Sequence, residues 1–261
     1  QRNEEAGSRK RARFLFGRAG LSWGMRQNRF GLSVALATPF TDDWLIDLPR
    51  FVAHGRQSLA DGCNSLTVFG TTGEGASLGL NERQRALGAL VGAGVDPATQ
   101  LVVGIAAASV EDAIAQGRAG LMLGCPSFLL APPFYFKGGG DEGLFDWFAA
   151  VLTGLGPKAS NVILYHIPQV TSVGLSVELI DRLKKAFPGQ VAGVKDSSGD
   201  WANSQALLEH HVNIEHACDM SAACTTCHVI VREGFRSLNE MEETEEDLLD
   251  RAWGLEPDSR L

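Results

Sequence analysis

Long apolar segments are missing from the 261-residue sequence, and no run reaches the roughly 18 residues that a membrane-spanning helix needs. Positive charge is also in deficit. There are 23 lysines and arginines against 31 aspartates and glutamates, a formal net charge of −8 at pH 7. A nucleic-acid-binding surface needs clustered lysines and arginines. We therefore expect neither a membrane nor a nucleic acid as a partner.

Cysteines are few. The chain has five, and in a chain of this length they do not form the disulfide framework of a small secreted protein. This favours a reducing, cytoplasmic setting. The remaining composition, 44% hydrophobic and 21% charged, is that of an ordinary globular protein. The length suits one large α/β domain.

The two ends differ from the middle of the chain. Residues 1–29 carry eight lysines and arginines but two glutamates, and their apolar stretches are too short for a secretory signal. We interpret them as a disordered basic leader, with a transit-like segment as the alternative. Residues 30–211 form the predicted core. Residues 212–261 form a divergent tail that is acidic from residue 239 onward.

Between these ends, short apolar runs alternate with amphipathic stretches of helical periodicity. The predicted strands are residues 31–39, 65–70, 101–106, 127–131, 162–167 and 191–194. The predicted helices are residues 47–61, 81–94, 109–124, 141–155, 176–187 and 200–211. Repeated β–α units of this kind require a parallel sheet with right-handed crossovers. A (β/α)8 TIM barrel and a doubly wound open sheet both satisfy the pattern.

The last predicted strand ends in a lysine. Lys195 closes the apolar run of residues 191–194, and a lysine is seldom fully buried without a partner or a chemical task. The alternative is that its ammonium simply reaches water at the strand end. In both candidate folds, ligands bind at the carboxyl ends of parallel strands. What the other strands end in therefore decides between the two interpretations.

Other strands end in groups that could work with an amine. The second strand runs into GTTGEG at residues 70–75, the fourth into PPFY at 132–135, and the fifth into YHIP at 165–168. Hydroxyls, a phenol and an amine thus gather at one edge of the sheet, as a nucleophile needs. Each piece alone also suits a plain turn or a core tyrosine. The glycine-rich turn matches neither a P-loop nor a dinucleotide-binding fingerprint.

Taken together and in this order, GTTGE, YHIP and GVKDSSG resemble the dihydrodipicolinate synthase and N-acetylneuraminate lyase family, over residue 30 to about residue 211. The resemblance implies a (β/α)8 barrel and a class I aldolase that acts on pyruvate or a related 2-oxo acid with an aldehyde partner. It makes Lys195 the Schiff-base lysine, Tyr165 the general acid/base and Thr71 the relay hydroxyl. Tyr135 would be a second relay tyrosine, lent to a neighbouring subunit.

The resemblance also implies binding residues and an assembly. Thr72 and Gly73, with the amides of their turn, would hold the substrate carboxylate, and Thr38 belongs to the same predicted substrate-binding set. No metal or organic cofactor is expected, because the Schiff base itself is the electron sink. The family suggests a homo-tetramer built as a dimer of dimers. A non-catalytic 2-oxo acid binding or regulatory barrel, or a degraded enzyme without turnover, is the alternative.

Val170 departs from the family pattern. In the synthase branch, an arginine stands two residues after the proline of the tyrosine motif and grips the carboxylate of a second substrate. Val170 occupies this place, two residues after Pro168. A valine cannot pair with a carboxylate, so we expect poor condensation of pyruvate with aspartate semialdehyde.

Residues 212–261 depart more widely, because no seventh strand, glycine-rich turn or eighth strand of the family is evident there. Candidate strands at 212–219 and 224–231 leave too few residues for a covering helix, so we expect a barrel that is incomplete at strands 7 and 8. The same part of the chain gathers possible metal ligands, namely His210, His211, His216, Cys218, Cys224, Cys227 and His228. A zinc site and a haem attachment motif are alternatives, but we favour coincidence and predict no metal site.

Overall fold

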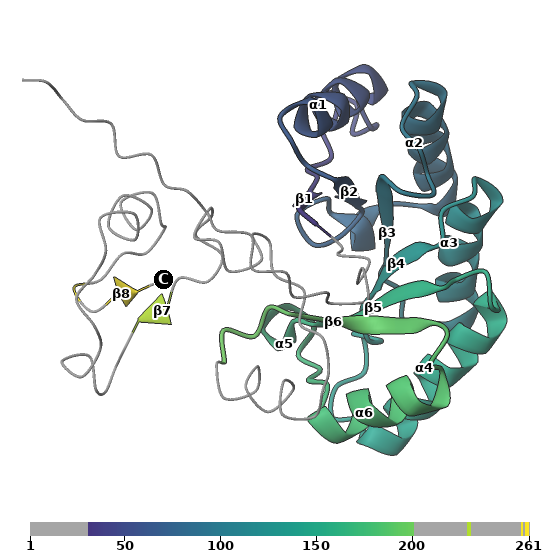
Figure 1. The fold of residues 1–261 in the computed structure, drawn as a ribbon, viewed down its shortest axis with the longest axis vertical. Helices are drawn as coiled ribbons and strands as arrows, with labels where there is room; N and C mark the ends of the chain where they lie inside the picture. The colour runs from purple at the N-terminus through teal and green to yellow at the C-terminus, as the bar shows by residue number, and fades with distance from the viewer. Residues whose placement is uncertain (1–30, 201–228, 231–256, 258, 261) are drawn as a thin grey trace, which may run out of the picture.

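The computed structural model describes residues 31–200, 229–230, 257 and 259–260. Six parallel strands form one sheet in the order β1-β2-β3-β4-β5-β6 (Figure 1). The strands are β1 (Ser33–Ala35), β2 (Ser65–Val68), β3 (Leu101–Ile105), β4 (Ser127–Leu130), β5 (Asn161–His166) and β6 (Val191–Asp196). The helices are α1 (Leu48–Ala60), η1 (Gly75–Ser77), α2 (Leu80–Gly92), α3 (Val110–Met122), α4 (Asp141–Leu155), α5 (Pro168–Thr171) and α6 (Val177–Ala186).

The helices cover one side of the sheet. Neighbouring long helices contact each other in chain order, α1 with α2, α2 with α3, α3 with α4, and α4 with α6 (Figure 1). A doubly wound sheet would divide them between two faces, whereas a barrel places them all outside. The predicted (β/α) barrel is therefore confirmed as an incomplete barrel of six strands, and the open-sheet alternative is wrong.

The strands bury both faces, and successive side chains alternate between two cores. Phe128 and Leu130 of β4 belong to the large core between the sheet and the helices. Leu129, which lies between them, packs on the inner face with Val102 and Ile163. This alternation is what turns a side chain of a barrel strand either toward the helices or toward the interior, where a ligand binds.

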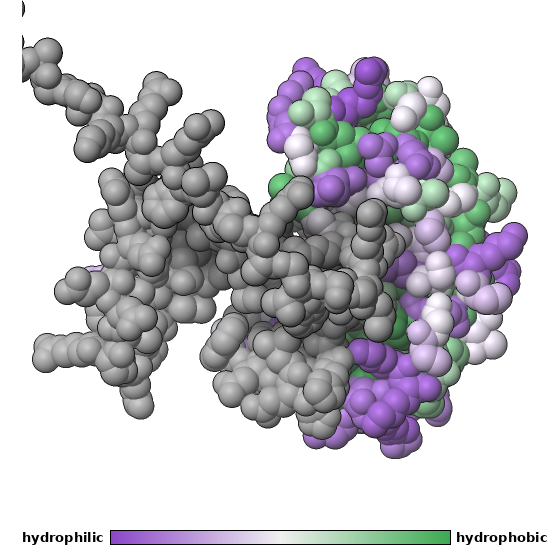
Figure 2. All heavy atoms as spheres, viewed as in Figure 1, coloured by the Kyte–Doolittle hydropathy of each residue, from purple (hydrophilic) through white to green (hydrophobic). Residues whose placement is uncertain are grey.

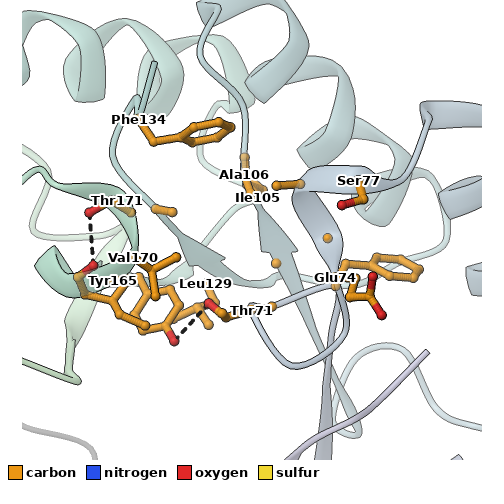
Figure 3. Close-up of a pocket in the computed structure, with 17 residues that line it drawn as sticks. Thr71, Glu74, Ser77, Ile105, Ala106, Leu129, Phe134, Tyr165, Val170 and Thr171 are labelled. Carbon is orange, nitrogen blue, oxygen red and sulfur yellow. Dashed lines mark hydrogen bonds between the residues drawn. The ribbon is translucent and has the colours of Figure 1, made fainter. Parts of the chain in front are cut away.

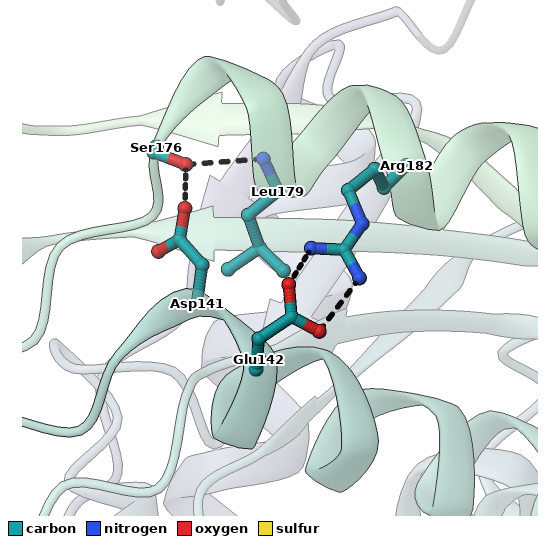
Figure 4. Close-up of polar contacts among 5 residues, drawn as sticks. All are labelled: Asp141, Glu142, Ser176, Leu179 and Arg182. Carbon is teal, nitrogen blue, oxygen red and sulfur yellow. Dashed lines mark hydrogen bonds and ion pairs between the residues drawn. The ribbon is translucent and has the colours of Figure 1, made fainter.

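Side-chain caps start the helices where the sequence predicts them. The Ser109 hydroxyl accepts a hydrogen bond from the backbone N–H of Asp112 at 3.0 Å and so caps α3. The Ser176 hydroxyl caps α6 in the same way, accepting from Leu179 N–H at 3.0 Å. It also donates to the Asp141 carboxylate at the start of α4 at 2.5 Å (Figure 4). One serine thus caps one helix and ties it to another.

The outer face of α6 is polar. Arg182 makes a two-pronged contact with Glu142 of α4, with N···O distances of 2.6 and 3.0 Å (Figure 4). Figure 2 shows hydrophilic residues gathered over this edge of the molecule, while the opposite side of α6 buries Leu179, Ile180 and Leu183. None of the described helices is long and apolar enough to cross a bilayer.

Two further short strands lie outside the six-stranded sheet. β7 (Val229–Ile230) and β8 (Ser259–Arg260) pair with each other in antiparallel fashion. Among the described residues, no strand pairs with the outer edge of β1 or of β6. The predictions for residues 1–29, 201–228 and 239–250, including the leader, the last helix, the strand at 212–219 and the cysteine and histidine cluster, lie outside the described residues.

Candidate active site

Tyr165 stands at the centre of the predicted site. Its phenol oxygen accepts a hydrogen bond from Lys195 Nζ at 3.3 Å. The same oxygen lies 3.3 Å from Thr71 Oγ1, where either hydroxyl can donate (Figure 3). The structure thus brings together the three residues predicted as Schiff-base lysine, acid/base and relay. They come from β6, β5 and the loop after β2, which are far apart in the sequence.

The sheet register explains why the lysine and the tyrosine meet. Tyr165 of β5 and Lys195 of β6 are directly paired in the parallel ladder, so their side chains share one face of the sheet. That face is the inner one, because Tyr165 packs against Leu129 and Ile163. Tyr165 is 6% exposed, so its ring is fixed by the core while its hydroxyl faces the site.

Lys195 is half-buried. Its ammonium lies 4.4 Å from the centre of the Tyr165 ring, close enough for attraction to the aromatic face. The side chain therefore does not run out into water, as the alternative interpretation would have it. It bends over Tyr165 and directs its nitrogen to the phenol oxygen.

The turn that carries Thr71 is unusually tight. Phe69 and Glu74 both adopt left-handed backbone conformations, with φ of 59° and 51°, which few residues other than glycine do. At Gly75 a Cβ atom would lie 1.8 Å from the carbonyl oxygen of Phe69. Only glycine fits there, and this explains the glycine in the GTTGEG motif.

Three predicted binding residues belong to this turn or support it. The Thr38 hydroxyl donates to the carbonyl oxygen of Gly73 at 2.8 Å, and both residues are buried. Thr72 is exposed. None of these three residues lines the cavity described below. Thr38 therefore supports the turn through its hydrogen bond to Gly73 and does not itself face the cavity.

Arg83 is a site residue that the sequence analysis misses. It is 1% exposed, and its guanidinium donates to the carbonyl oxygens of Gly75 at 2.6 Å and Gly104 at 2.8 Å. Its Nε has no hydrogen-bond partner in the structure, and burial lowers the pKa of Arg83 to about 10. The guanidinium thus fastens the glycine turn to the end of β3.

A signal for Arg83 was present in the sequence. It shares the buried face of α2 with Ala86, Leu87 and Leu90, at the i, i+3, i+4 and i+7 spacing of an inward helix face. A charged residue in such a row must find buried partners.

A cavity of about 260 Å³ opens beside Tyr165 and Thr71 (Figure 3). Most of its wall is apolar and comes from the turn after β2 with η1, from β3, β4 and β5, and from the segments that follow these three strands. The lining residues are Phe69, Gly70, Thr71, Glu74, Gly75, Ala76, Ser77, Gly104, Ile105, Ala106, Leu129, Ala131, Phe134, Tyr165, Ile167, Val170 and Thr171.

Tyr135 is not part of this cavity. It is 72% exposed and makes an edge-to-face contact with Phe136, with ring centres 5.1 Å apart. Both aromatic residues line a second hollow, of about 430 Å³, together with Trp147. Within this chain the structure does not bring Tyr135 to the other predicted catalytic residues, and its role at a neighbouring subunit stays a prediction.

Residues 28–219 match the model of the dihydrodipicolinate synthetase family. The chain belongs to this family. It is 37% identical over 188 residues to a protein of Chloroflexus aurantiacus described as an uncharacterized DapA-like lyase, covering 69% of this chain and 60% of that one. Over 179 residues it is 32% identical to the 4-hydroxy-tetrahydrodipicolinate synthase of Corynebacterium jeikeium, covering 69% and 57%.

A solved structure supports the same family assignment. The crystal structure of dihydrodipicolinate synthase from Agrobacterium tumefaciens strain C58 superposes with a TM-score of 0.69 at 49% identity, covering 71% of this chain and 65% of that one. The chain spans about 60% of the length of the curated family relatives named here. The family expected from GTTGE, YHIP and GVKDSSG is thereby confirmed.

A second match explains the departure after residue 211. Residues 191–255 match the model of the 2Fe-2S iron-sulfur cluster binding domain. A 66-residue stretch is 65% identical to a 2Fe-2S ferredoxin of Haemophilus influenzae, covering 24% of this chain and 58% of that one. This finding replaces the interpretation of residues 212–261 as a divergent family tail whose cysteines and histidines gather by coincidence.

Three cysteines of the matched stretch have the chemistry of ligands to such a cluster. A [2Fe–2S] cluster of this kind takes four cysteine thiolates, and the chain supplies Cys218, Cys224 and Cys227 in this stretch. No step of the reaction below involves a cluster.

Proposed function

We propose that the barrel is a Schiff-base-forming lyase, a class I aldolase that acts on pyruvate or a closely related 2-oxo acid. One observation supports this above the others: Lys195 Nζ, the Tyr165 phenol and the Thr71 hydroxyl form a continuous hydrogen-bonded chain on the inner face of the barrel. Membership of a lyase-containing family agrees with it.

The chemistry needs a nucleophile and a proton carrier at the same carbon. The neutral amine of Lys195 adds to the C2 carbonyl and gives a carbinolamine, whose loss of water gives the Schiff base. Tyr165 lies at hydrogen-bond distance from the amine, so it can deliver the proton that leaves with the water. Thr71 exchanges that proton with the phenol.

The carbon–carbon bond then forms or breaks at C3. The protonated Schiff base draws electrons from C3, and loss of a C3 proton gives an enamine. The enamine adds to the carbonyl of an aldehyde, which takes up a proton, and water releases the product from Lys195. In the cleavage direction the same steps run backward. The turn at Thr72 and Gly73 holds the 2-oxo acid carboxylate in this proposal, since tight turns with clustered amides suit anions.

The proposal includes an assembly and a location. A homo-tetramer made of two dimers would place the exposed Tyr135 near a neighbouring subunit. The low cysteine content favours the cytoplasm.

Reductive trapping tests the proposed function. Sodium borohydride added with pyruvate should leave a reduced adduct on Lys195, read by peptide mass spectrometry, and Lys195→Ala should abolish it. Lys185→Ala is the matched control, because Lys185 is an exposed lysine of α6 paired with Asp181, and it should keep the adduct. The absence of any adduct from folded protein over a panel of 2-oxo acids would overturn the proposal.

The rival function is a 2-oxo acid binding barrel without turnover. Within the described residues the sheet has six strands and is not closed, which favours this function, because a barrel closes only when its last strand pairs with its first. A pyruvate-dependent rise in melting temperature, without any exchange of the C3 hydrogens of pyruvate with solvent, would identify this function.

A further inference from the structure

We infer that the second substrate of this site is an aldehyde with an uncharged, apolar tail. The inference rests on the proposed function, because it concerns the cavity beside Tyr165, whose phenol oxygen contacts Lys195 Nζ. It names the substrate class that the cavity wall accepts.

The described part of the cavity wall offers no positive charge to a second substrate. Among the described residues that line it there is no lysine, arginine or histidine, and the one carboxylate is that of Glu74. A carboxylate taken out of water without a partner is strongly disfavoured. A substrate tail with its own carboxylate would meet apolar side chains on one side and like charge on the other.

Val170 lies beside the path that the tail of a second substrate would take from the reacting carbons. It lies on the short helix α5, directly after the strand that carries Tyr165, and it is 59% exposed. Figure 3 shows Val170 next to Tyr165, with Glu74 and Ser77 across the cavity. A chain that extends from the Schiff base carbon past Tyr165 therefore runs along a valine.

The rest of that side of the cavity is apolar as well. Leu129 and Ala131 are buried on β4 and just after it, and Ile167 and Phe134 complete the wall. The Thr171 hydroxyl is already engaged, because it lies 3.0 Å from the carbonyl oxygens of both Ile167 and Val173 and can donate its one hydrogen to either. Contact with these groups favours a hydrocarbon tail in proportion to the apolar surface it covers.

Lys137 is a cation near the cavity that could in principle attract a carboxylate. Its Nζ donates to the carbonyl oxygen of Thr171 at 2.8 Å and to that of Phe134, and both of these residues line the cavity. Lys137 itself is exposed and does not line the cavity. Its ammonium is engaged by these two backbone carbonyl oxygens.

A matched pair of 2-oxo acids tests the inference without requiring turnover. In 2-oxohexanoate and 2-oxoadipate the carbons beyond C3 occupy the place of the aldehyde, and the two differ in a terminal methyl or carboxylate. Borohydride trapping on Lys195 in the full chain should proceed about tenfold or more faster with 2-oxohexanoate. Val170→Arg should narrow or reverse this ratio, because arginine pairs with carboxylates.

The control variant is Met122→Arg, which adds the same charge at a position 82% exposed at the end of α3 and should leave the ratio unchanged. Pyruvate trapping on each variant shows that Lys195 still reacts. Equal trapping of the two acids, or a preference for 2-oxoadipate that Lys137→Met removes, would overturn the inference while the proposed function stands. Failure to trap pyruvate at all would overturn both.

Discussion

Tyr165 and Lys195 are paired neighbours in the β5–β6 ladder, and the lysine nitrogen lies 3.3 Å from the phenol oxygen and 4.4 Å from the ring centre. A backbone register shared by two parallel strands therefore brings the proposed nucleophile and the proposed proton carrier together. Since Tyr165 is packed into the inner core, neither group depends on a loop for its place.

Removing the phenol oxygen should slow Schiff base formation without lowering the stability of the fold. Tyr165→Phe keeps the ring that packs against the inner core and removes the atom that contacts Lys195 and Thr71. We expect the rate of Schiff base formation with pyruvate to fall by about 10²–10⁴-fold, the usual contribution of a positioned acid/base group. Stopped-flow mixing with pyruvate, quenched by borohydride, measures that rate.

The melting temperature of Tyr165→Phe should stay close to that of the parent chain, since the lost hydrogen bonds are partly exposed. Thr71→Ser, which keeps a hydroxyl, should retain most of the rate, and Thr71→Val should lose it. Trapping rates that are equal in all four proteins would show that the hydrogen-bonded chain has no part in the reaction.

Arg83 should matter for both stability and binding. Arg83→Met takes the guanidinium donor from the carbonyl oxygens of Gly75 and Gly104, although Gly75 keeps a hydrogen bond from Leu78 N–H at 3.3 Å. We expect this loss to cost about 1–3 kcal/mol of unfolding free energy. Urea denaturation measures this cost. Loosening of the glycine turn should also raise the pyruvate concentration needed for half-maximal trapping, with a smaller effect on the maximal rate.

Arg118→Met is the matched control, because Arg118 is exposed and donates to one carbonyl oxygen, that of Gly154, at 3.1 Å. Arg83→Lys should recover part of the pyruvate affinity. If Arg83→Met lowers stability but leaves the concentration dependence of trapping unchanged, the guanidinium supports the core and does not position the turn.

Much of the barrel follows from apolar patterning, because strands covered on both faces leave continuous apolar runs. Residues 101–106 and 127–131 predict β3 and β4 to within one residue at each end. The first strand is shorter than predicted, since its later residues make contacts that depend on distant parts of the chain. The Thr38 hydroxyl, for example, binds the carbonyl oxygen of Gly73, 35 residues away.

The site was less predictable than the fold. Motif order led to Lys195, Tyr165 and Thr71, but no local pattern predicts the left-handed conformation of Phe69 or the short helix α5. Both are set by tertiary packing. The Arg83 guanidinium, 5.1 Å from the Phe69 ring centre, belongs to the same packing.

Acid should weaken the barrel through His166. Its Nδ1 accepts a hydrogen bond from Leu175 N–H at 2.9 Å, and burial lowers the pKa of His166, opposed by the nearby charges of Asp196 and Asp200. A lowered pKa means that the unfolded chain binds the proton more tightly. The stability that comes from neutral His166 is therefore present at neutral pH and is lost as the pH falls below about 6.5 toward the folded-state pKa.

Melting temperatures measured from pH 7.5 to 5 in the parent chain and in His166→Asn check this. The asparagine carbonyl can accept the Leu175 hydrogen bond without titrating, so the variant should lose less stability at pH 5 than the parent chain does. His54→Asn, at an exposed position of α1, is the control and should keep the parent's pH dependence. If the melting temperature depends on pH equally in all three proteins, the loss of stability in acid does not come from His166.

The outer edges of β1 and β6, with which no described strand pairs, should limit both stability and turnover. Within the described residues, β1 pairs only with β2, and β6 only with β5, whereas closing a barrel removes exposed edges. Replacing residues 212–261 with the closing segment of the Agrobacterium relative, which is 49% identical over the matched region, supplies strands for these edges. We expect a higher melting temperature, less aggregation and faster turnover of 2-oxo acids.

A graft of the same segment onto the Lys195→Ala chain separates the two effects. It should gain the stability and none of the turnover, because the closing strands complete the wall of the cavity while Lys195 supplies the nucleophile. Light scattering on heating and the rate of pyruvate C3 hydrogen exchange measure the two quantities. If the parent chain already melts cooperatively at an ordinary temperature and matches the graft in exchange rate, the edges of β1 and β6 are not what limits it.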